Sequence, residues 1–308
     1  MKKNQTIHNP LVSVVMPIYN AELFLREAVD SILAQTYQHF ELILVNDAST
    51  DSSLSIMQSY KKQFPKKITI LNLKKTLNRG GDSCANKGLE VAKGTYVARM
   101  DADDVAHPER LAKQVAFLEK NPATFLVGTN AFVIDAKGQV IGEKNEPSSH
   151  SQIYNNYFTY HPIIHPSAMY RRLYKNTPFS YTLKFSANND YYSFFRLICQ
   201  GAQFANLPEK LLFYRVHKNN NTFNNIKTKF MNTLKTRIKM VKTYGYSPTA
   251  AQIAITVIQF LTIMCLPEGV LTRLYLISKG VIKPGKKIGE LFSSFLSLLS
   301  RKSTAVTS

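Results

Sequence analysis

Short apolar segments alternate with segments of helical spacing through the first hundred residues of the chain. Two of them, Leu11 to Ile18 and Phe40 to Asn46, are continuous and rich in β-branched residues, which is typical of strands buried on both faces. Further segments of this kind run from Ile68 to Leu73 and onward from Thr95, and apolar residues at helical spacing follow the first three. This alternation predicts βαβ units and therefore an α/β domain with a parallel sheet.

The apolar segment that begins at Thr95 ends in three carboxylates, Asp101, Asp103 and Asp104. Ligands of open α/β sheets bind outside the carboxyl ends of the strands, so we expect this cluster at the mouth of a crevice. Like charges this close repel one another unless a cation lies between them, and carboxylate oxygens suit Mg²⁺ or Mn²⁺. The cluster predicts a metal site that binds a diphosphate. The alternative is an acidic turn before the helix expected near Pro108.

Polar residues also follow the first two predicted strands. Tyr19 and Asn20 come after the first strand, and Asp47 comes after the second. Their convergence with the acidic cluster is what a nucleotide crevice requires. Tyr19 offers a ring face to a base, and the alternative is that it only packs against its strand end. Asp47 can accept a hydrogen bond from a base, or form an Asx turn with Ser49.

Charge is distributed unevenly along the chain. The formal net charge is +19, and the residues from Glu209 onward contain 16 Lys and Arg against 3 Glu, a net +13 (16 − 3). This asymmetry suggests a polyanionic partner for the last third, either nucleic acid or anionic lipid. Cys84, Cys199 and Cys265 lie far apart, without metal-ligand spacing or a disulfide pattern. We therefore expect a reducing, cytoplasmic compartment.

The last third differs in kind from the rest, and we expect residues 221–308 to form a basic, amphipathic helical extension of a domain at 1–220. Lys227 to Tyr244 predicts a basic helix, and Ala250 to Leu266 is mostly apolar. A helix that spans a bilayer needs about 20 residues, so we interpret the apolar segment as buried or interfacial, with insertion as the alternative. Two shorter amphipathic segments follow, Leu271 to Ile282 and Ile288 to Leu299. Apolar faces bordered by lysines suit the anionic inner surface of a cell membrane.

The motifs VSVVMPIYN, ELILVNDASTD, NRGGDSCANKGLEVAKGTYVARMDADD and PERLAKQVAFLE occur in this order. Together they resemble family 2 glycosyltransferases of the A-type fold, over roughly residues 10–220, in particular those of bacterial cell-surface polysaccharides. The resemblance implies a mostly parallel, Rossmann-like sheet flanked by helices. It also implies inverting transfer of a sugar from a nucleotide-diphospho-sugar, usually with Mn²⁺ or Mg²⁺, to a hydroxyl of a glycan or lipid-linked acceptor. UDP is the nucleotide that the family uses most.

The resemblance also implies roles for individual residues. Donor-nucleotide binding is implied for Pro17, Tyr19, Asn20, Glu22, Asp47, Arg79, Asp101, Ala102, Arg215 and His217. Asp103 matches the principal metal ligand of the family, with Asp101 acting on the ribose or through metal-bound water, and His217 is a further candidate ligand. Asn46 departs from the pattern, because many relatives have a second aspartate there.

On the acceptor side, Asp190 matches the catalytic base of the family and is the last aspartate in the chain. A helix N-cap is its alternative role. Asn189 replaces the glutamate that usually precedes this base. His165 and Ser167 lie in the segment that matches NP-x-x-HPS of the family, so we expect them beside the acceptor. The alternative for His165 is a structural histidine in a turn.

Two rival functions remain open from the sequence. A nucleic-acid-binding protein would explain the charge, but no binding module or interleaved aromatic motif accompanies the basic residues, and we expect no nucleic-acid partner. A nucleotide-sugar-binding protein without transferase activity is the second rival. The presence of both Asp103 and Asp190 favours an enzyme over this second rival.

Overall fold

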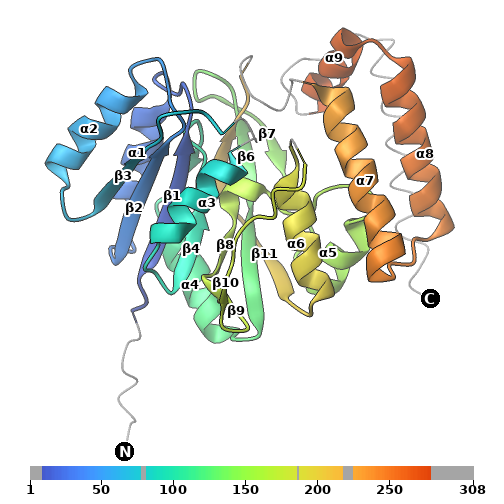
Figure 1. The fold of residues 1–308 in the computed structure, drawn as a ribbon, viewed down its shortest axis with the longest axis horizontal. Coiled ribbons are helices and arrows are strands. Elements are labelled where there is room, and N and C mark those ends of the chain that lie inside the picture. The colour runs from blue at the N-terminus through green and yellow to red at the C-terminus, as the bar shows by residue number, and fades with distance from the viewer. Residues whose placement is uncertain (1–8, 78–80, 186, 218–224, 279–308) are drawn as a thin grey trace, which may run out of the picture.

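The computed structural model describes residues 9–77, 81–185, 187–217 and 225–278 (Figure 1). Its centre is a nine-stranded sheet with the order β3-β2-β1-β4-β8-β6-β11-β5, and β7 pairs with β6. The strands are β1 (Val12–Ile18), β2 (Phe40–Asn46), β3 (Ile68–Asn72), β4 (Tyr96–Arg99), β5 (Val105–Ala106), β6 (Thr124–Ile134), β7 (Val140–Lys144), β8 (Met169–Arg171) and β11 (Gln203–Arg215). Strands β5, β7 and β8 run antiparallel to their neighbours, and the other pairings are parallel. The expected mostly parallel α/β sheet is confirmed.

Helices cover both faces of this sheet (Figure 1). The helices of this part are α1 (Leu25–Leu33), α2 (Ser53–Gln63), α3 (Asp82–Val91), α4 (Arg110–Lys120), α5 (His150–Asn156) and α6 (Asn189–Cys199). Alternate residues of β1 point to opposite faces. Val14 lies in a core cluster with residues of α1, α2 and α4, whereas Val15 lies in a second cluster with residues of α3, α5 and α6. The burial of β1 on both faces explains its continuous apolar sequence.

Close packing of α3 against the sheet brings the start of this helix to the strand ends. A Cβ atom on Gly88 would lie 2.5 Å from Cγ1 of Val15, so only glycine permits this approach. Gly81, which precedes the helix, has a φ of 76° in the left-handed region. These two glycines position Asp82, the first residue of α3, beside the candidate site.

The rest of the described chain adds a small hairpin and three helices. The hairpin pairs β9 (Leu173–Tyr174) with β10 (Thr177–Pro178), and a short 3₁₀ helix occupies His165–Ser167. The helices are α7 (Ile226–Tyr244), α8 (Ala250–Cys265) and α9 (Glu268–Ser278). Met240 and Tyr246 belong to the core cluster of α6, so the start of the predicted extension packs onto the sheet domain.

The predicted helix at Ala250 to Leu266 is present as α8, but no residue of α8 is buried. Its buried interpretation is therefore wrong. Among the described helices, none combines the length and apolarity that crossing a bilayer requires. The expected segment from Ile288 to Leu299 lies outside the described residues, as does the last part of Leu271 to Ile282.

Candidate active site

The carboxyl ends of β2, β1 and β4 lie next to one another, because these strands are parallel neighbours in the sheet. Tyr19 follows β1, Asp47 follows β2, and Asp101 comes shortly after β4. The structure thus brings together the polar residues that the sequence placed at separate strand ends. The side chain of Tyr19 is 57% exposed, which leaves its ring accessible to a ligand.

Asp47 is buried against the segment that follows β3. The amide of Leu77 donates to its Oδ1 at 2.8 Å, and the hydroxyl of Thr76 donates to its Oδ2 at 3.2 Å. These bonds fix the carboxylate at the strand end, and each oxygen retains a second lone pair for a further donor.

The Asx turn expected at Asp47 is formed by Asn46 instead. Oδ1 of Asn46 accepts from the amide of Ser49 at 3.1 Å, and its Nδ2 donates to Oδ1 of Asn72 at 2.8 Å. The donor group of the amide makes the second bond possible, which an aspartate in this position would lack. This bonding gives a structural reason for the departure from the family pattern at Asn46.

Two further predicted donor residues connect the loop after β1 to the loop after β2. Oδ1 of Asn20 accepts from the amide of Thr50 at 2.8 Å, and Oε2 of Glu22 accepts from the amide of Ser52 at 2.9 Å. Asn20 has a φ of 48°, which asparagine tolerates better than most residues. Pro17 is half-buried within β1. Asn20 and Glu22 therefore shape the loop that bears Tyr19.

The acidic turn after β4 gathers its three carboxylates. Ligand atoms of Asp101, Asp103 and Asp104 lie within 4.8 Å of one another. Burial raises the pKa of Asp104 well above its usual range, and the charges of Asp103 and Asp101 raise it further. Oδ2 of Asp104 is buried and has no hydrogen-bond partner among the described residues. Ala102, between the first two aspartates, is also buried.

Arg99 places a positive charge behind this turn. Its Nη2 lies 2.7 Å from Oδ1 of Asp101, and the side chain is almost completely buried. Burial raises the pKa of Asp101, and Arg99 opposes that rise. Arg99 therefore partly neutralises Asp101, and the side chains of Asp101 and Asp103 are 35% and 28% exposed.

Arg215, predicted to contact the donor diphosphate, is 1% exposed and bonded to the turn. Its amide donates to Oδ1 of Asp104 at 2.8 Å, and its Nε donates to the carbonyl of Asp103 at 2.7 Å. Its Nη2 forms an ion pair with Glu27 of α1. The geometry gives Arg215 the task of holding the acidic turn in shape.

His217 completes the edge of the acidic turn. Its Nε2 lies 3.0 Å from Oδ2 of Asp103, and its ring packs 4.7 Å from the ring of Phe24. The carboxylate oxygens of the turn are the donors that suit Mn²⁺ or Mg²⁺. The buried, unpartnered Oδ2 of Asp104 adds a further oxygen close by. The residues present therefore fit a divalent metal, with Asp103 and Asp101 as the carboxylates.

A second charged group lies at the start of α6. The predicted base, Asp190, belongs to the first turn of the helix, whereas the N-cap position is Asn188. Oδ2 of Asp190 lies 3.3 Å from Nε2 of His161 and 3.7 Å from Nδ1 of His165. Burial would raise the pKa of Asp190, but His165, His161 and the amide of Tyr191 lower it well below the usual range. Asp190 is therefore ionised at neutral pH.

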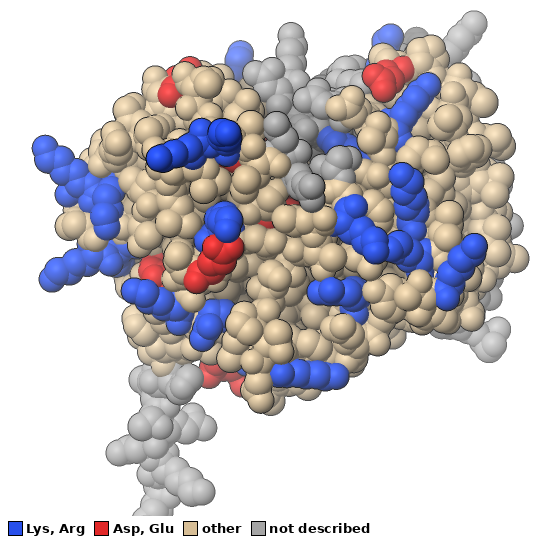
Figure 2. Space-filling model, viewed as in Figure 1, with Lys and Arg blue, Asp and Glu red and all other residues tan. Residues whose placement is uncertain are grey.

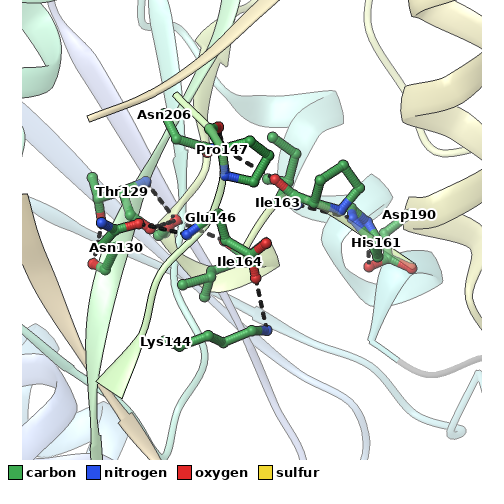
Figure 3. A network of polar contacts seen from close by, with 12 residues as sticks. Thr129, Asn130, Lys144, Glu146, Pro147, His161, Ile163, Ile164, Asp190 and Asn206 are labelled. Atoms are coloured by element: carbon green, nitrogen blue, oxygen red, sulfur yellow. Dashed lines mark hydrogen bonds and ion pairs between the residues drawn. The ribbon is translucent and has the colours of Figure 1, made fainter. Parts of the chain in front are cut away.

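The loop that carries His161 is itself held in place (Figure 3). The amide of Ile163 donates to Nδ1 of His161 at 3.3 Å, so a neutral ring carries its proton on Nε2, which faces Asp190. Nδ2 of Asn206 donates to the carbonyls of Pro147 and Pro162 at 2.7 and 3.0 Å. These bonds fix the histidine that contacts the predicted base.

His165 is mostly enclosed, with a side chain 16% exposed. The hydroxyl of Tyr181 lies 2.9 Å from its Nε2, and Oδ1 of Asp82 lies 3.9 Å from the same nitrogen. Burial lowers the pKa of His165 to about 3. His165 is therefore neutral at neutral pH.

Two other predicted acceptor-side residues make structural bonds. The hydroxyl of Ser167 is buried, accepts from the amide of Thr129 at 3.0 Å and donates to the carbonyl of Ile164 at 2.7 Å. The amide of Asn189 is also buried and bonds to both backbone groups of Phe185, at 2.9 and 3.0 Å. Both side chains thus brace backbone near the site.

Sequence reasoning missed Asp82, Arg99, His161 and Tyr181. Asp82 is 3% exposed, and burial raises its pKa well above the usual range, with Asp190 raising it further and Arg99 opposing the rise. The only sequence signal for His161 was its place in the first of two neighbouring His-Pro pairs. Arg79, in contrast, was predicted and lies outside the described residues.

A mostly parallel sheet with an acidic turn at its strand ends, together with a second carboxylate at the start of α6, is typical of the A-type glycosyltransferase class. Comparison with known proteins supports the same assignment. Residues 13–177 match the family described as Glycosyl transferase family 2. An uncharacterized glycosyltransferase of Haemophilus influenzae is 35% identical over an alignment of 221 residues, and the match covers 68% of this chain and 67% of the relative. Another, from Methanocaldococcus jannaschii, is 34% identical over 76% of this chain and 81% of its own length.

Solved structures share the fold. Staphylococcus aureus TarS 1–349 in complex with UDP-GlcNAc has a TM-score of 0.62 at 18% identity and covers 80% of this chain and 70% of its own. The mannosyltransferase PcManGT of Pyrobaculum calidifontis, in complex with GDP-Man and Mn²⁺, has a TM-score of 0.56 at 18% identity and covers 95% and 81%. The chain belongs to glycosyltransferase family 2 and is a glycosyltransferase, as the sequence predicted.

Proposed function

We propose that this enzyme transfers a sugar from a nucleotide-diphospho-sugar, with UDP as the nucleotide, to a hydroxyl group of a glycan or lipid-linked acceptor, with inversion at the anomeric carbon. The observation that carries this proposal is the pairing of an ionised Asp190 with the acidic turn in one site. Contacts link the two: His165 lies 3.7 Å from Asp190 and 3.9 Å from Asp82. Gly81, which precedes Asp82, lies against Arg99, and Arg99 pairs with Asp101 at 2.7 Å.

The donor nucleotide would lie along the ends of β1 and β2. The exposed ring of Tyr19 offers a stacking surface for the base. Asp47, held by Thr76 and Leu77, would accept the N3–H of uracil. The relatives support a nucleotide sugar in general, since TarS is described with UDP-GlcNAc and PcManGT with GDP-Man.

The donor diphosphate would lie at the acidic turn. Asp103 and Asp101 would hold a divalent metal, with His217 in contact with Asp103. Such an ion, when bound, neutralises negative charge on the leaving diphosphate. Mn²⁺ accompanies GDP-Man in PcManGT, which supports a divalent metal here.

Asp190 would accept the proton of the acceptor hydroxyl. Its low pKa keeps it ionised, and His161 contacts one of its carboxylate oxygens. The activated hydroxyl would attack the anomeric carbon from the face opposite the diphosphate, so the configuration inverts. With Asp190 acting as a base and no covalent intermediate formed, a single displacement follows.

The acceptor class is proposed from the relatives and from the charge of the chain. The Bacillus subtilis protein TuaG, 40% identical over 116 residues that make up 38% of this chain, bears a name that refers to teichuronic acid biosynthesis. We infer that this enzyme also serves cell-envelope polysaccharide synthesis, at the inner face of the membrane.

A panel of UDP- and GDP-sugars tests the proposal, with isothermal titration and with product analysis in the presence of Mn²⁺, Mg²⁺ or EDTA. We expect at least one UDP-sugar to bind with a metal-dependent affinity and to release UDP slowly in the absence of acceptor. Failure of every nucleotide sugar to bind would contradict the donor class, and preference for a GDP-sugar would contradict the assignment of UDP.

A further inference from the structure

Helix α8 carries its apolar side chains away from the protein. Between Ala250 and Cys265 the sequence contains no charged residue, and no residue of the helix is buried. The exposed side chains include six large apolar ones: Ile253, Val257, Ile258, Phe260, Leu261 and Met264. Surface helices of globular proteins normally direct such residues toward the core.

Three polar residues of α8 face the protein instead, whereas Thr262 near the end of the helix is exposed. Gln252, Thr256 and Gln259 share one face of the helix, because they are spaced four and three residues apart. Nε2 of Gln252 donates to the carbonyl of Asn155 at 2.6 Å, and Nε2 of Gln259 donates to the carbonyl of Thr159 at 3.2 Å. The polar stripe thus joins α8 to α5 and to the segment that follows it.

A buried arginine of α7 completes this attachment. Arg237 is 3% exposed, and its Nη1 donates to Oε1 of Gln259 at 2.8 Å and to Oγ1 of Thr256 at 3.2 Å. Its Nη2 donates to the carbonyl of Thr159. A buried charge is costly unless it is hydrogen-bonded, so these contacts specify which face of α8 turns inward. The outward apolar row is therefore a consequence of specific bonds.

The surroundings of this row indicate its partner. Lys235 and Lys242 of α7 are exposed, and Figure 2 shows lysine and arginine side chains over α6 and α7 beside an outer edge that is largely uncharged. An apolar surface bordered by basic residues complements a bilayer with anionic headgroups. The 16 residues of α8 extend about 24 Å, less than the roughly 30 Å of a hydrocarbon core. The helix can therefore lie along the membrane surface.

We propose that the outer face of α8 docks on an anionic phospholipid bilayer, with its apolar row at the acyl-chain boundary and the lysines of α7 near the headgroups. This inference deepens the proposed function, because it names the surface that would bring the active site to a lipid-linked acceptor. Only the identity of the acceptor rests on the proposed function. Docking of a second copy of the chain on α8 is the competing outcome of the test.

The test uses the full chain and vesicle flotation. Wild type is compared with the double variant Val257→Glu/Leu261→Glu, which places two carboxylates on outward positions that are 50% and 53% exposed. The matched control is Val140→Glu, a 55% exposed valine on β7. With phosphatidylcholine vesicles that contain phosphatidylglycerol, we expect the double variant to lose at least about tenfold in vesicle partitioning, because charged groups are excluded from the apolar boundary. The control should bind as wild type does, and vesicles of phosphatidylcholine alone should bind more weakly.

Melting temperature and titration with UDP plus Mn²⁺ are measured for every variant, which separates loss of docking from loss of folding or of the donor site. Absence of UDP binding would count against the proposed donor, and the vesicle result would still test the membrane docking of α8. Wild-type flotation by the double variant, or no flotation of wild type, would overturn the docking proposal. A third outcome would also overturn the proposal: wild type is a dimer, the double variant is a monomer, and neither protein binds vesicles. In that case α8 would contact a second copy of the chain.

Discussion

Nε2 of His161 lies 3.3 Å from Oδ2 of Asp190, and this contact joins the loop before the 3₁₀ helix to the first turn of α6. The amide of Ile163 bonds to the other nitrogen of the ring, so a neutral ring carries its proton on Nε2, the nitrogen that lies nearer the carboxylate. His161 thereby holds the predicted base in one orientation and favours its ionised form.

Replacement of His161 tests this positioning role. His161→Phe keeps an aromatic ring among Tyr157, Tyr191 and Phe194 but removes the N–H group. We expect kcat for sugar transfer to fall about tenfold with an unchanged KM for the donor, because the substitution changes the orientation and the pKa of the base and leaves the donor site as it is. The acid limb of the pH–rate profile should also move to higher pH. His161→Gln, whose amide can still donate, should recover part of the rate, and equal rates in the two variants would argue against the contact.

His165 gives a prediction for the pH dependence of stability. Its pKa in the folded protein is about 3 because the ring is buried, whereas an unfolded histidine titrates near 6.5. Between these values the unfolded chain binds more protons, so the free energy of unfolding falls as the pH drops through this window, by about 1.4 kcal/mol per pH unit.

Urea unfolding of wild type and His165→Gln at several pH values between 4 and 8 measures this slope, with His39→Gln, a change at an exposed histidine, as the control. The His165 variant should show a smaller slope than wild type, and the control should not. Parallel curves for wild type and His165→Gln would mean that His165 is protonated as readily in the folded state.

Asp103 tests the metal site. Asp103→Asn keeps the shape of the side chain and removes the charge, so we expect the increase in UDP affinity that Mn²⁺ produces in wild type to drop at least about tenfold. Titrations of UDP with and without Mn²⁺ measure this increase. Glu109→Gln, at an exposed carboxylate paired with Lys113, serves as the control. If Mn²⁺ raised the UDP affinity of Asp103→Asn as much as that of wild type, Asp103 would not be a metal ligand.

The buried amide of Asn189 predicts a cost in stability for its acidic counterpart. In Asn189→Asp the donor to the carbonyl of Phe185 is lost and a charge is buried near Asp190. The free energy of unfolding should therefore fall by about 1–3 kcal/mol. Asn176→Asp adds the same charge at an exposed position and should have little effect. The denaturant midpoints of wild type and both variants are compared. If Asn189→Asp had the same midpoint as Asn176→Asp, the hydrogen bonds of Asn189 would not contribute to stability.

The sequence predicted the elements that carry strong local signals and missed those that depend on tertiary contacts. β1 and β2 have continuous β-branched runs, and their predicted bounds agree with the structure to within one residue. No strand was predicted over β11, because Pro208 and Lys210 interrupt its pattern at register shifts against β6. α8 was recognised as a helix, but its inverted orientation depends on Arg237, which lies on another helix.

The candidate site follows the same division. Asp101, Asp103 and Asp190 lie in motifs that the sequence displays directly. Arg215 lies in such a motif too, but its ion pair with Glu27 of α1 joins residues far apart in the chain. Asp82 has no local signal for its proximity to His165, because only the packing of α3 on the sheet brings the two together.

The central claim is that Asp190 removes the proton of the acceptor hydroxyl, and the rate of sugar transfer by Asp190→Asn tests it most directly. Asparagine keeps the size of the side chain but accepts no proton, so transfer should fall by about 10²–10⁴-fold. Donor affinity and melting temperature should stay near those of wild type, because the proposed nucleotide site lies at the ends of β1 and β2. A transfer rate close to wild type would contradict the account.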